Sequence, residues 1–171
     1  IDIKKRDSAR LNFFDLKGIS NYWGFALVRN PYDRLVSCYS EKIRNDGPEG
    51  LFVDGVSKAL TKYGVFRNGM PFEEFVFEVA CIKDIWADPH FRSQSSFIYN
   101  RHGHMRVNYI GHFETIDKEM QVLAEYLGTN FPVPHLLKSD RKEWQSYYTK
   151  SLRDIVYKRY KKDFLLFGYD K

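Results

Sequence analysis

The sequence is poor in cysteine and has no long hydrophobic run. Only Cys38 and Cys81 occur among its 171 residues, so a framework of several disulfides is excluded, and we expect no structural disulfide between these two. The longest apolar stretches, such as residues 24–28, fall far short of the roughly 20 residues that a membrane-spanning helix needs. The sequence therefore predicts a domain without a membrane span.

The chain also lacks a glycosylation acceptor, and we expect no signal peptide in its first residues. No Asn-x-Ser/Thr triplet occurs, which favours a cytoplasmic protein over one from the secretory pathway. Residues 1–7 include neither a long apolar segment nor a small-residue cleavage site, so they are not a signal peptide. Because the first residue is Ile1 rather than Met, we expect the sequence to begin downstream of another segment.

The composition is that of one folded domain with an anionic partner. Hydrophobic residues make up 43% of the chain and aromatic residues 17%, which excludes a disordered tail, and the length suits a single core. The net charge of +5 leaves nucleic acid, a membrane surface, an acidic glycan and a phosphorylated cofactor open as partners. Nucleic acid is the least favoured, because the basic residues form no dense run and the aromatic residues have core spacing.

Hydrophobic patterns predict strands that alternate with helices. A continuous apolar run over residues 21–28 is typical of a buried parallel strand, and Pro31 begins a helix that continues to residue 43. We also predict loops over 45–50 and 138–142, a helix over 71–81, a hairpin tip over 100–104, a short strand over 107–111, a helix closed by Gly128 and a terminal helix through Phe164. This order indicates an α/β fold.

Residues 28–39 combine groups that bind anions. Arg29 lies at the carboxyl end of the predicted strand, directly after residue 28, and a helix follows, which brings a guanidinium and free backbone N–H groups to one place. Ser37 lies one turn beyond Arg34 on the same helix face, where its hydroxyl can bind the same anion. Ligands of open α/β sheets bind at the carboxyl ends of strands, so the segment predicts a cofactor pocket. In the alternative interpretation, Arg29 pairs with a core carboxylate and Ser37 binds no ligand.

The order Arg-Asn-Pro-x-x-Arg-Leu-Val-Ser-x-Tyr at residues 29–39 resembles the 3'-phosphate-binding motif of sulfotransferases that use 3'-phosphoadenosine 5'-phosphosulfate (PAPS). The similarity is to the carbohydrate sulfotransferases often called family 2. Residues 88–94, 109–116 and 157–169 resemble further stretches of this family, in the family's order. The resemblance implies a single sulfotransferase domain over residues 1–171, with a partial P-loop-like parallel sheet flanked by helices.

The resemblance also implies a reaction and roles for particular residues. Arg29 and Ser37 are expected to hold the 3'-phosphate of the cofactor. Ser139, Arg141 and Lys142 belong to a basic loop that is expected to close over the nucleotide, although a solvated basic loop is the alternative. PAPS is the expected sulfate donor, 3'-phosphoadenosine 5'-phosphate (PAP) is its product, and the acceptor is a hydroxyl of a carbohydrate or glycoconjugate.

One part of the family pattern is absent from this sequence. The loop with Lys and Ser/Thr that grips the 5'-phosphosulfate has no counterpart before Arg29, and no Gly-x-x-x-x-Gly-Lys-Ser/Thr occurs. We therefore expect a domain that is incomplete at its N-terminus, with an exposed sheet edge covered by a partner or a second copy of the chain. The alternative function is a non-catalytic fragment or degenerate homologue that binds a 3'-phosphonucleotide or another anion. For a eukaryotic member, the resemblance implies the Golgi lumen instead of the cytoplasm.

The sequence leaves the catalytic base open. Relatives often have a histidine upstream of the cofactor motif, whereas residues 6–9 here contain none. His90 is the remaining candidate for the acceptor side, and a structural histidine is its alternative. His102 and His104 have a spacing that suits zinc, but no carboxylate or cysteine flanks them at ligand spacing, so we expect no metal site.

Overall fold

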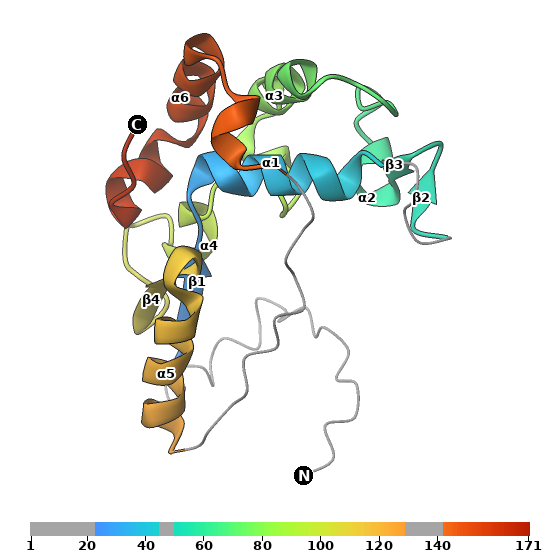
Figure 1. Ribbon diagram of the computed structural model, residues 1–171. Coiled ribbons are helices and arrows are strands. Elements are labelled where there is room, and N and C mark those ends of the chain that lie inside the picture. The colour runs from blue at the N-terminus through green and yellow to red at the C-terminus, as the bar shows by residue number, and fades with distance from the viewer. Residues whose placement is uncertain (1–22, 45–49, 129–141) are drawn as a thin grey trace.

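A short parallel sheet leads into the helix that the sequence predicts after Asn30. The computed structural model describes residues 23–44, 50–128 and 142–171 (Figure 1). Strand β1 (Phe25–Val28) pairs in parallel with β4 (Tyr109–His112), so that Val28 lies opposite His112. Strand β1 ends where the sequence predicts, and β4 ends one residue later. The predicted α/β fold with a parallel sheet is confirmed.

Helix α1 (Pro31–Lys42) begins directly after β1 because Asn30 and Pro31 set its first turn. The side-chain oxygen of Asn30 accepts a hydrogen bond from the Tyr32 N–H at 2.9 Å. Proline suits the first helical position, because its missing N–H would have no partner there. The predicted strand, tight turn and helix are therefore confirmed, and the carboxyl end of β1 lies at the helix start.

The remaining described residues form short elements and three longer helices. The predicted helix over 71–81 corresponds to α3, the helix closed by Gly128 to α5, and the terminal helix to α6. In chain order the elements are β2 (Phe52–Val53), β3 (Val56–Ser57), α2 (Lys58–Thr61), α3 (Phe72–Cys81), η2 (Asp84–Trp86), α4 (Ser95–Ile98), η3 (Phe113–Thr115), α5 (Ile116–Leu127), η4 (Trp144–Tyr147) and α6 (Lys150–Phe167).

The antiparallel hairpin of β2 and β3 was not predicted. Its strands have two residues each, which is too short for an alternating pattern. The available signal is the pair Asp54-Gly55, whose φ angles of 48° and 73° are typical of a two-residue hairpin turn. A side chain at Gly55 would also meet the Asn68 side chain at 2.5 Å, so the turn requires glycine there.

Three helices enclose the main core above the sheet. Helices α1, α3 and α6 contact one another, whereas α5 packs against β4 (Figure 1). Four aromatic side chains of the core are at most 1% exposed: Tyr32, Phe75, Phe91 and Phe164. Burial of such large apolar surfaces is the main force that holds these helices together.

The structure also bears on the cysteines, on membrane spans and on the edges of the sheet. Cys38 is buried, Cys81 is exposed and both thiols are free, as the sequence predicts. In the described part of the chain, no helix is long and apolar enough to span a bilayer. The sheet has two strands there, so each strand keeps one edge without a strand neighbour, and Phe25 on β1 is 42% exposed.

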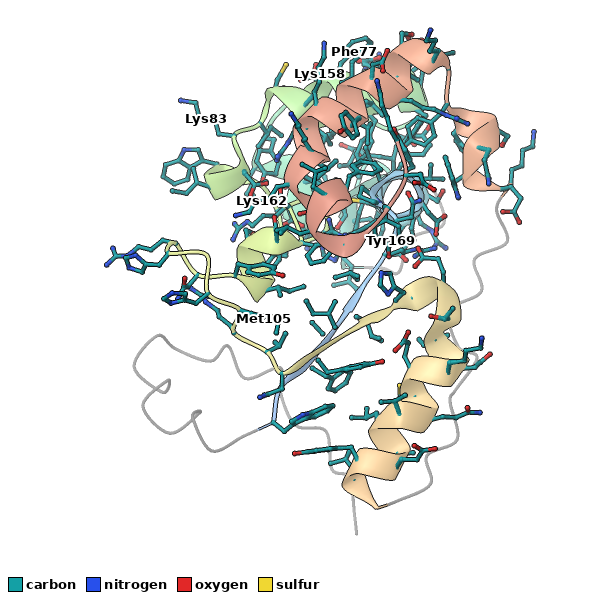
Figure 2. All side chains as sticks on the ribbon, turned by 90° about the vertical axis from the view of Figure 1, so that its left-hand side faces the viewer. Phe77, Lys83, Met105, Lys158, Lys162 and Tyr169 are labelled. Atoms are coloured by element: carbon teal, nitrogen blue, oxygen red, sulfur yellow. The ribbon has the colours of Figure 1, made fainter. Side chains whose placement is uncertain are left out.

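Replacing Phe91, which is completely buried, tests this assignment of the core. We expect Phe91→Ala to lower the free energy of unfolding by about 3–5 kcal/mol, because it removes a large side chain and leaves a cavity. Chemical denaturation measures this loss. Phe77→Ala is the matched control, since Phe77 is 46% exposed and lies at the outer edge of the helices (Figure 2), and we expect a change within about 0.5 kcal/mol. Equal losses for the two variants would contradict the assignment.

Candidate functional site

The Arg29 side chain lies at the carboxyl end of β1 and is held on two sides. Its Nε donates a hydrogen bond to Asp33 Oδ2 at 2.5 Å, and the guanidinium carbon lies 4.5 Å from the centre of the Phe113 ring. Among the described residues, the Arg29 side chain makes its hydrogen bond through Nε and not through its two Nη groups. The two Nη groups therefore form a preformed fork that suits the oxygens of a phosphate.

The backbone around Arg29 is held by side chains from distant parts of the chain. Gln94 Oε1 accepts from the Arg29 N–H at 2.9 Å, and Gln94 Nε2 donates to the Arg29 carbonyl at 2.8 Å. The next N–H, of Asn30, donates to Glu114 Oε1 at 2.6 Å. These bonds satisfy the backbone groups that the end of the strand leaves without a ladder partner.

Glu114 also receives a hydrogen bond from the C-terminal segment. The Tyr169 hydroxyl donates to Glu114 Oε2 at 2.9 Å, and Tyr169 lies between α6 and the sheet (Figure 2). Burial, together with this hydrogen bond to a carboxylate, raises the pKa of the Tyr169 hydroxyl, so the group stays a donor at neutral pH. The segment over residues 109–116 thus contributes Glu114, whose side chain supports the site by binding the backbone of Asn30.

The helix start offers fewer backbone donors than the sequence predicts. Pro31 has no N–H, the Tyr32 N–H is bound by the Asn30 side chain, and the Arg34 N–H donates to the Asn30 carbonyl at 2.8 Å. The Asn30 N–H is bound by Glu114. The expectation of a cluster of free N–H groups is therefore wrong for these residues, because the capping interactions that start α1 use them. The groups that remain available to an anion here are therefore mainly side chains.

Ser37 lies on the same face of α1 as the partner of Arg29. It follows Asp33 by four residues, which is about one helical turn, and it is half-buried. Asp33, which pairs with Arg29, and Ser37 are therefore neighbours along one face of the helix. That Arg29 and Ser37 contact one anion stays a prediction of the sequence.

The Arg34 side chain binds two backbone carbonyl oxygens. Its Nη1 donates to the Arg92 carbonyl and its Nη2 to the Pro89 carbonyl, both at 2.7 Å. Both end groups of this guanidinium therefore bind backbone oxygens of the irregular segment 88–92. Arg34 ties that segment, including His90, to α1.

His90 forms a pair with a buried carboxylate. Its Nδ1 lies 2.6 Å from Asp88 Oδ1, and its backbone N–H donates to the same oxygen at 3.0 Å. Asp88 is 5% exposed, whereas the His90 side chain is 46% exposed. A carboxylate that accepts from Nδ1–H leaves the lone pair of a neutral imidazole on Nε2. Sequence reasoning missed Asp88, although its spacing of two residues from His90 is typical of such a local turn.

The predicted basic loop is described only at its end. Ser139 and Arg141 lie outside the described residues, and Lys142 is exposed. Two residues later the Trp144 ring stacks on Tyr32 with centroids 5.3 Å apart, in the first turn of α1. The chain therefore returns from this loop to a point three residues from Arg29.

His102 and His104 remain an exposed pair on the turn after α4, with ring centroids 6.3 Å apart. Across residues 23–44, 50–128 and 142–171, no cluster of three or more His, Cys, Asp or Glu could hold a metal ion.

Helix α6 anchors the segment that carries Gln94. The carboxylate of Asp163, a completely buried residue, accepts from the N–H groups of Gln94 and Ser95 at 2.7 and 2.9 Å. One turn earlier, Arg159 forms an ion pair with Asp84 at 2.9 Å. Asp84 also accepts from the backbone N–H and the hydroxyl of Ser93, each at 2.9 Å. These contacts were not predicted, because the partners are far apart in the sequence.

The family of the chain follows from a comparison with known proteins. The sequence model of the sulfotransferase family matches residues 4–170, so the chain belongs to this family. The confirmed α/β architecture and the motif at residues 29–39 agree with that assignment.

Its relatives include named carbohydrate sulfotransferases. Carbohydrate sulfotransferase 10 from Xenopus laevis is 26% identical over 195 residues, which cover 98% of this chain and 54% of that protein. Carbohydrate sulfotransferase 9 from Homo sapiens is 25% identical over 190 residues, which cover 94% of this chain and 41% of that protein. The chain thus spans about half the length of these relatives. No solved structure matches it.

The ion pair of Asp84 gives a pH-dependent prediction. Partial burial raises the pKa of the Asp84 carboxyl, but hydrogen bonds from Ser93 and Arg159 outweigh this effect and hold the pKa below its usual value. A carboxyl with a lowered folded-state pKa stabilises the fold at neutral pH, and the contribution is lost as the pH falls through that lowered pKa. We therefore expect Asp84→Asn to destabilise the fold more at about pH 7 than at about pH 3.

Urea denaturation at the two pH values measures this difference. Asp170→Asn is the control, because Asp170 is exposed near the C-terminus, and it should change stability little at either pH. A loss for Asp84→Asn that is the same at both pH values would refute the role of its charge.

Proposed function

We propose that this chain binds the 3'-phosphate of PAPS for transfer of the sulfuryl group to a hydroxyl of a carbohydrate or glycoconjugate. The observation that carries the proposal is the preformed Arg29 fork, held by Asp33 and Phe113. A cationic fork and the Ser37 hydroxyl fit a phosphate, which offers several oxygen acceptors. The relatives are named carbohydrate sulfotransferases, which supports a carbohydrate as the acceptor.

The basic loop would add contacts to the same nucleotide. We assign Ser139, Arg141 and Lys142 to this secondary role, because the chain that follows them packs on the first turn of α1 through Trp144. Cations near the nucleotide would neutralise the negative charge of the phosphates. No residue of this chain is assigned to the 5'-phosphosulfate, since the sequence has no Lys and Ser/Thr loop of the family's kind.

The proposed reaction is an in-line displacement. The acceptor oxygen forms a bond to sulfur while the bond from sulfur to the 5'-phosphate oxygen breaks, and the hydroxyl proton passes to a base. We propose His90 Nε2 as that base, since Asp88 binds the Nδ1 side of the same imidazole. Arg34 supports the assignment by holding the segment of His90 against the helix that also carries Ser37.

A second candidate function is nucleotide binding without catalysis. The observation that favours it is that the given sequence has no Lys and Ser/Thr loop of the family's kind before Arg29. In that case the chain binds PAP and transfers no sulfate. The cytoplasmic location and the association with a partner or a second copy stay predictions of the sequence.

Titration calorimetry with PAP tests the 3'-phosphate site. Hydrogen bonds to charged groups are worth about 1.5–3 kcal/mol, so we expect Arg29→Ala to weaken PAP binding about tenfold to a hundredfold. The same variant should bind adenosine 5'-monophosphate (AMP) as the parent chain does, because AMP lacks the 3'-phosphate. Arg101→Ala, on the exposed turn after α4, is the matched control. If the parent chain binds PAP no better than AMP, the proposal is wrong.

Sulfate-transfer assays test the proposed base. We expect His90→Gln to lower the transfer rate about a hundredfold or more and to leave the PAP affinity unchanged. Asp88→Asn should also lower the rate, since the neutral amide does not stabilise the protonated imidazole as the carboxylate does. His104→Gln is the control, because His104 is exposed on another segment. A His90→Gln variant with the parent rate excludes His90 as the base.

A further inference from the structure

Helix α6 is linked to the junction of β1 and α1 through two side chains. Asp163 of α6 binds the backbone of Gln94, and the Gln94 side chain binds the backbone of Arg29. Each oxygen of the Asp163 carboxylate accepts one backbone N–H, from Gln94 and from Ser95. Helix α4 has four residues, so it gains little stability from its own hydrogen bonds. Asp163 therefore fixes the start of this short helix and the position from which the Gln94 side chain extends.

Gln94 occupies the place of a neighbouring strand. Strand β1 ends at Val28, so the next residue, Arg29, has no ladder partner for its N–H and carbonyl. The Gln94 carboxamide binds both groups, one with its oxygen and one with its nitrogen. Gln94 is 7% exposed, so little water is available to replace either bond. A glutamine carboxamide offers an acceptor and a donor together at neutral pH.

These contacts determine the place of the cationic fork. The Arg29 guanidinium is oriented by Asp33 and Phe113 only if the Arg29 backbone stays in register with them. A binding group needs supporting contacts that hold it within about 0.5 Å of its working position. The two hydrogen bonds from Gln94 are such contacts, and Asp163 supplies their anchor in the core.

We propose that Gln94, held by Asp163, is a positioning residue that sets Arg29 for recognition of the 3'-phosphate. Through Asp163, helix α6 then affects how well the site distinguishes PAP from AMP, although neither Asp163 nor Gln94 contacts the nucleotide. The inference rests on the proposed function, because it assumes that Arg29 binds this phosphate.

The test is the ratio of the AMP and PAP dissociation constants in matched variants. Gln94→Met keeps the length of the side chain and removes both hydrogen bonds. We expect it to lower this ratio about tenfold, toward the value of Arg29→Ala. In the Arg29→Ala background, Gln94→Met should cause no further change, because both changes act on the same contact. Gln94→Glu should resemble Gln94→Met, since a carboxylate oxygen would face the Arg29 carbonyl.

A control removes a similar bond at the other end of the sheet. Asn108 Oδ1 accepts from the Gly24 N–H at 2.8 Å, next to the amino end of β1. Asn108→Ala should leave the AMP-to-PAP ratio unchanged even if stability falls. If Asn108→Ala lowers the ratio as much as Gln94→Met does, a general loss of structure explains the effect and the inference is wrong.

Amide hydrogen exchange provides a readout without nucleotide. We expect Gln94→Met and Asp163→Asn to accelerate exchange at the Arg29 N–H, whereas the Val28 N–H keeps its protection. Unchanged exchange at Arg29 in folded Gln94→Met overturns the proposed support.

The outcomes also separate this inference from the proposed function. A parent chain that binds AMP and PAP equally well refutes the proposed function and, with it, the positioning role. If Arg29→Ala abolishes the preference for PAP and Gln94→Met retains it, the proposed function stands and the inference about Gln94 fails.

Discussion

The site depends on one buried carboxylate, that of Asp163. A charge that is completely removed from water is tolerated only where hydrogen bonds replace the lost hydration, and here two backbone N–H groups do so. The same two hydrogen bonds stabilise the buried carboxylate and also fix the start of α4 and the Gln94 side chain. The Gln94 side chain in turn fixes the backbone of Arg29 through two hydrogen bonds. The position of the cationic fork therefore follows from how α6 packs into the core.

The site is assembled from segments that are far apart in the chain. The end of β1 supplies Arg29, the segment after β4 supplies Glu114, and the C-terminal segment supplies Tyr169 through its bond to Glu114. Both contacts join residues that lie 55 or more positions apart in the sequence. The motif at residues 29–39 is consequently a local sequence feature whose geometry is set by long-range contacts.

The sequence predicted the features that depend on local patterns. The strand before Arg29 and the helix over 71–81 show a continuous apolar run and a helical period, and both were confirmed. The hairpin of β2 and β3 was missed, because two-residue strands carry no period. Arg29 and Ser37 could be named from their motif, whereas Gln94 and Asp163 could not, since their partners lie 65 and more positions away. The prediction of free N–H groups at the helix start was wrong, because the Asn30 side chain accepts from the Tyr32 N–H and the distant Glu114 accepts from the Asn30 N–H.

The ion pair between Arg29 and Asp33 has a consequence for how the site attracts its ligand. A guanidinium beside a carboxylate is nearly neutral at a distance, so the pair produces little long-range field. Chloride and other simple anions gain little from such a pair, whereas an anion with several oxygens can engage the two Nη groups at short range. Because Asp33 already orders the Arg29 side chain, binding also restricts fewer rotamers. Under the proposed function, recognition at this position would depend on shape and hydrogen bonding more than on the net charge of the Arg29–Asp33 pair.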